Sequence, residues 1–153
     1  MNIFLKLLVI ILIIFLNSCS KKEEKITIIQ EKEIQLQMID AYKEGVEALE
    51  KGDVLFAAKK FNEAEILFPQ SVWASKSILM AAYSYYTQDY YYDAISELDR
   101  FIKNYPKDER LNYAHFLLAM CYYEQIVDEK KDLGPLLNAQ KEFKFIIKNY
   151  PNS

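Results

Sequence analysis

Few residues of this chain are of the types that carry out catalysis. The sequence has one histidine, His115, and two cysteines, Cys19 and Cys121. A catalytic histidine needs a nucleophile or an acidic partner beside it, and no motif in the sequence supplies one. CxxC and HExxH motifs and glycine-rich phosphate loops are all missing from the sequence. We therefore expect His115 to be structural, the chain to be non-enzymatic, and no metal or cofactor to be bound.

The two cysteines lie in different settings. Cys121 falls within a predicted helix, where a cysteine behaves as a small buried hydrophobic residue. Cys19 ends the tetrapeptide Leu16-Asn17-Ser18-Cys19, which resembles a bacterial lipobox, although Asn17 departs from the usual small or apolar choice. The resemblance implies cleavage after Ser18, diacylation of the Cys19 thiol and acylation of its new amino group. Several acyl chains together make a lasting membrane anchor.

The residues before Cys19 have the pattern of an export signal. Lys6 adds a positive charge near the amino terminus, and an unbroken apolar run follows from Leu7 to Leu16. This run is shorter than the roughly 20 residues that a membrane-spanning helix needs. We predict a lipoprotein signal peptide over residues 1–18. An uncleaved anchor is the alternative, because apolar residues before Lys6 lengthen the run.

The segment after Cys19 is expected to connect the lipid to the fold. Ser20 follows, not the aspartate that typically retains lipoproteins at the inner membrane. By that resemblance the destination is the periplasmic face of the outer membrane of a Gram-negative bacterium. Residues 20–25 are polar and charged, so we predict a lipidated, flexible tether over residues 19–38. Residues 26–37 fit either a linker or an extension of the first helix.

Composition indicates a folded protein and excludes one class of partner. Apolar residues make up 52% of the sequence and charged residues 27%, which is typical of a folded chain. With only 3 Gly and 4 Pro, the chain has few of the residues that an all-β fold uses in its turns. The net charge is −3, whereas a nucleic-acid-binding protein needs a basic surface. We therefore expect no nucleic-acid partner.

A helix–turn–helix unit that recurs three times must position the other residues. Small residues and a closing proline recur at matching places: Gly45, Ala57 and Pro69; then Ala82, Ala94 and Pro106; then Ala119, Ala139 and Pro151. The first two sets are 37 residues apart, a spacing typical of tetratricopeptide repeats. We predict an all-α, tetratricopeptide-like solenoid with three repeats, over residues 39–69, 70–106 and 107–153.

The residues at the expected turns support this division. Gly52 can adopt the left-handed conformation that ends a helix, and Asp53 can cap the next one. Pro135 suits a first helical position in the third repeat. After the prolines, Ser71 and Asp108 are predicted to cap the following helices.

The last repeat ends at a similar cap with no helix after it. Ser153 follows Pro151 as Ser71 follows Pro69. Solenoids normally close with a polar capping element, because an open end exposes an apolar face. We therefore expect the sequence to be the N-terminal part of a longer repeat protein. The alternative is a three-repeat protein that dimerises through this end.

Aromatic residues indicate where the chain would bind a partner. The sequence has 12 Tyr and 9 Phe, many of them on the first helix of each repeat. In tetratricopeptide solenoids, residues that flank the small position line the concave surface. That pattern selects Tyr42, Val46, Leu79, Tyr83, Tyr86, Tyr113, Phe116, Met120 and Tyr123. We predict an aromatic, hydroxyl-bearing peptide groove, with packing between repeats as the alternative role of each tyrosine.

A lipobox, a short charged tether and repeats that end in Phe-Pro or Tyr-Pro together resemble the BamD family of outer-membrane assembly lipoproteins. The most specific segments are residues 52–71, 81–106 and 143–153. The long charged turn of the third repeat is also similar to that family. The resemblance covers the whole chain, but the family typically has five repeats and this sequence has three.

The resemblance implies a non-enzymatic subunit of the β-barrel assembly complex. Such a subunit binds unfolded outer-membrane β-barrel proteins and a BamC-like accessory lipoprotein, and it docks on the POTRA domains of BamA. The family makes the BamA contact through C-terminal repeats that this sequence lacks. Two alternatives remain open from the sequence: another periplasmic repeat lipoprotein that serves cell-wall or pilus assembly, or the N-terminal repeat region of a larger enzyme.

Overall fold

The computed structural model describes residues 28–127 and 132–152. The predicted signal peptide, Cys19 and the first part of the predicted tether lie outside the described residues, as does part of the loop of the third repeat. In the portion that is described, no helix combines the length and the apolar character needed to cross a membrane.

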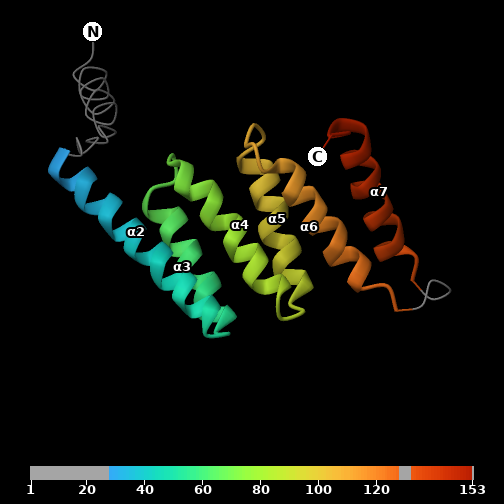
Figure 1. The fold of residues 1–153 in the computed structure, drawn as a ribbon, viewed down its shortest axis with the longest axis horizontal. Coiled ribbons are helices and arrows are strands. Elements are labelled where there is room, and N and C mark those ends of the chain that lie inside the picture. Colours follow the sequence, from blue (N-terminus) through green and yellow to red (C-terminus); the bar gives the residue numbers. More distant parts are fainter. Residues whose placement is uncertain (1–27, 128–131, 153) are drawn as a thin grey trace, which may run out of the picture.

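The described residues form three antiparallel helix pairs in a row (Figure 1). The helices are α2 (Ile28–Glu50), α3 (Val54–Leu67), α4 (Val72–Tyr86), α5 (Tyr91–Asn104), α6 (Leu111–Glu124) and α7 (Gly134–Asn149). Each helix packs against its neighbours in the chain, and α4 also touches α6. Helices α2, α4 and α6 run in one direction, and α3, α5 and α7 return (Figure 1). The prediction of an all-α, tetratricopeptide-like solenoid is confirmed.

Two predicted helix starts are capped by the expected side chains. Gly52 has a φ of 80°, a conformation that strains any residue with a Cβ, and it ends α2. Asp53 then accepts a hydrogen bond from the backbone N of Phe56 at 3.2 Å. Ser71 accepts one from the backbone N of Ala74 at 3.1 Å. Both bonds satisfy amide groups that lack a partner within the helix.

The later helix starts differ from one another. Pro135 lies in the first turn of α7, as predicted. The prediction that Asp108 caps α6 is wrong, because that helix begins only after Arg110 and has no side-chain cap. Its loop is longer than the one after Pro69, which leaves Asp108 too far from the first helical amides. Asp108 instead accepts hydrogen bonds from the backbone N of Arg110 and from its guanidinium group.

The small residue in the middle of α2 is explained by the close crossing with α3. Phe61 is completely buried at this crossing. A Cβ added to Gly45 would lie 2.8 Å from Cε1 of Phe61, so a larger residue would displace the ring. Burial of a phenylalanine side chain contributes about 2 kcal/mol. The repeated small residues therefore reflect the short distance between paired helices.

Two apolar clusters form the core, and α4 contributes to both. The first contains Met38, Phe61 and Ala81, and the second contains Leu98 and Phe101. Because opposite sides of α4 are packed in this way, a narrow strip of that helix is left at the surface. This strip carries part of the predicted groove.

Helix α2 begins earlier than expected. The predicted tether over residues 19–38 is helical from Ile28 onward, so the alternative of a helical extension fits the described residues. Met38 is completely buried, and Ile34 lines a hollow together with Leu67 and Phe68. The extension thus lies beside the end of α3, and Glu31 in its first turn suits the positive end of the helix dipole.

Candidate peptide-binding surface

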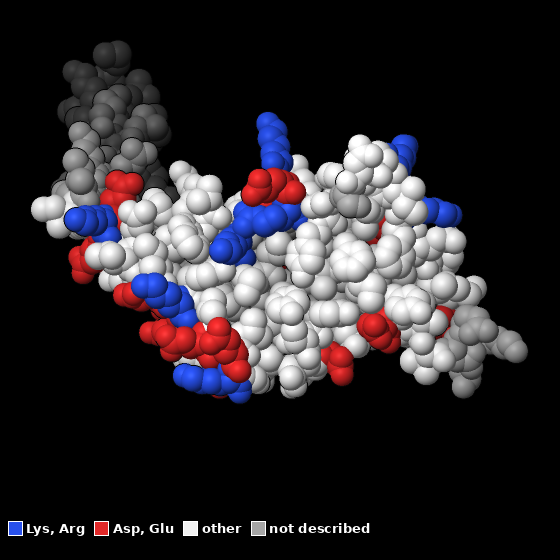
Figure 2. All heavy atoms as spheres, in the orientation of Figure 1, with Lys and Arg blue, Asp and Glu red and all other residues white. Residues whose placement is uncertain are grey.

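The predicted groove residues divide into an exposed and a buried set. Tyr83 is 37% exposed and Tyr113 is 40% exposed. Two residues on α6, Phe116 and Tyr123, are also exposed. Three other predicted groove residues are partly buried: Val46, Tyr86 and Met120. These residues lie along α4 and α6, with Val46 apart from them on α2. Figure 2 shows that the face over α4 and α6 is nearly free of charged side chains.

Tyr42 and Leu79 are buried instead. The ring of Tyr42 packs edge-on against Phe61 and Trp73, with centroid distances of 5.2 Å and 5.1 Å. Tyr42 therefore packs between the first and second helix pairs, which is the alternative role that the sequence left open for each tyrosine. Leu79 is 6% exposed and lies at the bottom of a surface hollow.

That hollow lies between α4 and α6 and has a volume of about 410 Å³. Its lining consists of Lys76, Leu79, Met80, Tyr83, Arg110 and Tyr113. Positions 76, 80 and 83 share one helical face, so the period of α4 could have indicated Lys76 and Met80 from the sequence. Arg110 comes from the loop before α6 and carries no such signal.

The hydroxyl groups of Tyr86 and Tyr113 stay protonated at neutral pH. Burial raises the pKa of Tyr113, and the neighbouring Tyr83 and Tyr86 raise it further. Burial also raises the pKa of Tyr86, with an added contribution from Glu124. Because a protonated phenol both donates and accepts hydrogen bonds, these rings offer apolar area with a polar tip.

One end of the hollow is basic and held in place by neighbours. The ammonium group of Lys76 lies 5.0 Å from the ring centroid of Trp73 and 5.2 Å from that of Tyr42. The Arg110 guanidinium donates to Asp108 at 2.8 Å and 2.7 Å and to Ser75 Oγ at 2.8 Å. These hydrogen bonds lower the pKa of Asp108 to about 2. Lys76 and Arg110 also line an adjoining hollow of about 590 Å³.

His115 and Cys121, the residues considered first in the sequence, are both buried. His115 Nδ1 lies 2.7 Å from Glu142 Oε2 in a buried contact, and the ring of Phe145 stacks on the imidazole at 4.1 Å between centroids. Cys121 is completely buried, and burial raises the pKa of its thiol to about 12. Within the described residues, no three potential ligand side chains gather into a metal site.

Comparison with known proteins gives a consistent result. The family model that matches residues 34–153 is that of the outer membrane lipoprotein YfiO. The chain is 35% identical to the outer membrane protein assembly factor BamD of Caulobacter vibrioides over 136 residues, which is 88% of this chain and 43% of that protein. It is 28% identical to BamD of Rickettsia prowazekii over 150 residues, 97% of this chain and 57% of that protein. The chain thus spans about half the length of these curated relatives.

Proposed function

The chain belongs to the YfiO family of outer membrane lipoproteins, and from this membership we propose that it helps to assemble β-barrel proteins in the outer membrane. The matched relatives are named as outer membrane protein assembly factors. Those names support an assembly role over a cell-wall or pilus scaffold and over a region of a larger enzyme. The proposed protein is a non-enzymatic subunit that acts through binding.

Attachment to the membrane is proposed through Cys19. The lipobox-like tetrapeptide that ends at Cys19 supports cleavage after Ser18 and acylation of the cysteine. Ser20 supports a position on the periplasmic face of the outer membrane. Mass spectrometry of the mature chain should find an acylated Cys19 as the first residue, and an unmodified cysteine would contradict this anchor.

The surface over α4 and α6 is proposed to bind unfolded barrel proteins. The observation that carries this proposal is the mostly apolar hollow that Leu79, Tyr83 and Tyr113 line together, two of which also carry a hydroxyl group. Aromatic side chains of an extended segment would fill such a hollow, and tyrosines hold a partner at a small entropic cost. Segments rich in aromatic residues are therefore the expected substrate.

Affinity for an aromatic-rich peptide tests this proposal. The double change Tyr83→Ala and Tyr113→Ala should weaken binding at least tenfold in isothermal titration calorimetry, because it removes both walls of the hollow. Tyr92→Ala is the matched control, since Tyr92 is an exposed tyrosine on α5 away from the hollow. Equal affinity of the double variant and the control would contradict the proposed site.

Partner subunits follow from the same family membership. We propose that the protein contacts the POTRA domains of a BamA-like barrel protein, mainly through repeats beyond this sequence, and a BamC-like lipoprotein. The length of the relatives supports this division, because the chain covers 43% and 57% of two of them. Isolation of the tagged protein from outer membranes without a POTRA-bearing barrel protein would argue against the assignment.

A further inference from the structure

The two long edges of the solenoid differ in their connections. One edge, here called the proline edge, carries the start of α2, the loops that contain Pro69 and Pro106, and the end of α7 (Figure 1). The opposite edge, here called the turn edge, carries the connections within the helix pairs. The tether from Cys19 reaches α2 at Ile28 and therefore enters the fold at the proline edge.

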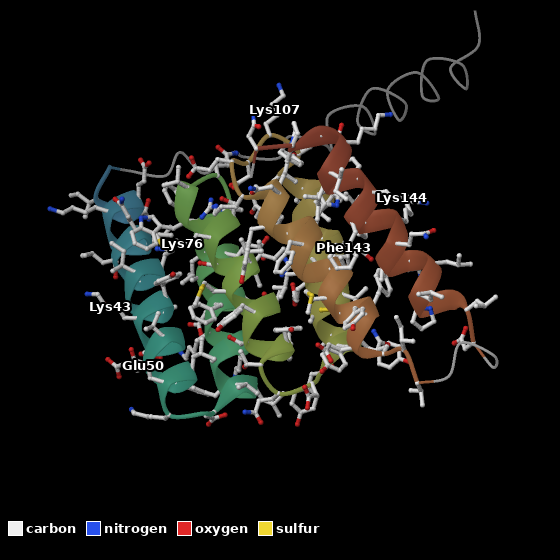
Figure 3. All side chains as sticks on the ribbon, turned by 45° about the vertical axis from the view of Figure 1, so that its right-hand side comes forward. Lys43, Glu50, Lys76, Lys107, Phe143 and Lys144 are labelled. Atoms are coloured by element: carbon white, nitrogen blue, oxygen red, sulfur yellow. The ribbon has the colours of Figure 1, made fainter. Side chains whose placement is uncertain are left out.

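The proline edge carries exposed lysines. Lys103 and Lys148 occupy the last turns of α5 and α7, at equivalent places in the second and third repeats. Lys107 lies in the loop between α5 and α6 and projects outward from this edge (Figure 3). All three side chains are exposed, and no described carboxylate forms an ion pair with them.

Exposed apolar side chains accompany these lysines. Ile66 near the end of α3 is 75% exposed, and Val72 at the start of α4 is 80% exposed. Ile147 in the last turn of α7 is similarly exposed. Lysine beside exposed aliphatic residues is the composition that binds the interface of a membrane, where the charge meets headgroups and the apolar group enters below them.

Acidic residues on the proline edge are few or neutralised. Asp108 forms an ion pair with Arg110, and Glu109 is exposed in the same loop. The start of α2 adds Glu31 and Glu33, with Lys32 between them.

The turn edge has the opposite charge. Its exposed acidic residues are Glu47, Glu50, Asp53, Asp89, Asp93, Glu124 and Asp132. Among the described residues of this edge, Lys51 is a lysine whose Nζ lies 3.9 Å from Oε2 of Glu47. Figure 2 shows acidic side chains along the lower border of the molecule, with basic ones among them at the lower left, and basic side chains that project at the upper border beside a group of acidic ones.

We propose that the proline edge faces an anionic phospholipid surface, with Lys103, Lys107 and Lys148 directed at the headgroups. The inference rests on the proposed acylation of Cys19. Residues 19–27 reach at most about 30 Å when fully extended, so the anchor keeps this edge near the bilayer. Each lysine near an anionic membrane strengthens association about fivefold, and the acidic turn edge is repelled from the same surface. The peptide-binding face then lies between the two edges, with its basic end toward the lipid.

The single tryptophan provides the test, because Trp73 lies in the first turn of α4 at the proline edge. The acylated mature protein is placed in vesicles of phosphatidylcholine, with or without 30% phosphatidylglycerol, that contain a dansyl-labelled lipid. Energy transfer from Trp73 to the dansyl headgroups should rise severalfold when phosphatidylglycerol is present and fall at high salt. Transfer that is the same in both kinds of vesicle would overturn the proposal.

Matched variants separate this edge from general charge effects. The triple change K103E/K107E/K148E should abolish the increase caused by phosphatidylglycerol. K43E/K51E/K59E makes the same change in net charge at exposed lysines off the proline edge and should retain the increase. Equal losses in both variants, with unchanged thermal unfolding, would overturn the proposal.

Flotation of the vesicles distinguishes this orientation from the anchor on which it rests. Protein that does not float with neutral vesicles would refute the anchor and the orientation together. Protein that floats but shows no dependence of energy transfer on phosphatidylglycerol would refute the orientation alone.

Discussion

The first and third helix pairs place equivalent aromatic residues in different surroundings. Tyr42 and Phe116 are two repeat lengths apart, on α2 and α6. Tyr42 is 9% exposed because Trp73 from the following pair covers it, whereas Phe116 is 46% exposed. No described helix follows α7, so nothing in the described structure covers Phe116 in the same way. Exposure of an aromatic residue on these helices therefore depends on the next pair as well as on its own position.

Because of this difference, exposure is stronger evidence of a binding role for some predicted groove residues than for others. Phe116 and Tyr123 lie on α6, for which no further helix pair is described beyond α7. Tyr83 lies on α4, which has helices packed on both sides, and it is exposed nonetheless. Its exposure is a property of the groove itself, which makes Tyr83 the more informative residue for substrate binding.

The largest expected effect contrasts the two equivalent aromatic residues directly. Tyr42→Ala should lower the free energy of unfolding by about 3 kcal/mol, because it leaves a cavity between Phe61 and Trp73. Phe116→Ala should lower it by less than about 1 kcal/mol, since the ring is half exposed. Urea denaturation of both variants measures the difference. Similar losses would show that the two positions are packed alike in solution.

A smaller effect is expected from the polar contact that ties α6 to α7. Glu142→Ala should destabilise the fold by about 2 kcal/mol, because it leaves the buried Nδ1 of His115 without its partner. Glu142→Gln retains an acceptor for His115 and should cost less. Glu124→Ala, at an exposed glutamate on α6, is the control. A Glu142→Ala variant as stable as this control would contradict a stabilising role for the pair.

The smallest effect concerns the loop before α6 and depends on pH. Hydrogen bonds from Arg110 lower the pKa of Asp108 from 3.8 to about 2. Because the folded pKa is the lower one, the ionised Asp108 stabilises the fold above about pH 4, and this contribution is lost as the pH falls toward 2. Asp108→Asn should therefore cost about 1 kcal/mol at pH 6, after allowance for solvent screening, and almost nothing at pH 2. Chemical denaturation at both values measures this, and a loss independent of pH would contradict it.

The fold was largely predictable because its signals are local. Gly52 and Asp53 mark the turn through conformational rules that act within a few residues. Gly45, Ala57 and Phe61 mark the crossing of two helices that follow each other in the chain. The start of α2 was not predictable in this way. The side chain of Ile34 lines one hollow together with Leu67 and Phe68 at the end of another helix, and no rule that acts within a few residues predicts this proximity.

The candidate site was predictable only in part. Periodicity placed Leu79 and Tyr83 on one face of a helix, and in the structure both residues line one hollow beside α4. Periodicity alone could not distinguish Tyr42, which is packed, from Tyr83, which is exposed. Lys76 could have been found from the same helical face. Arg110 reaches the hollow from the loop before α6, which is too long for Asp108 to cap that helix as predicted.

The sequence by itself determined the repeat, the helix pairs, the turns and the lipobox-like tetrapeptide at Cys19, since each of these depends on residues that are close along the chain. Only the tertiary structure decided which aromatic residues are exposed, how His115 is paired with Glu142, and that the lysines of separate repeats share one edge. The physical reason is that burial and charge clustering depend on neighbours contributed by other helices. Their proximity arises only when the pairs stack.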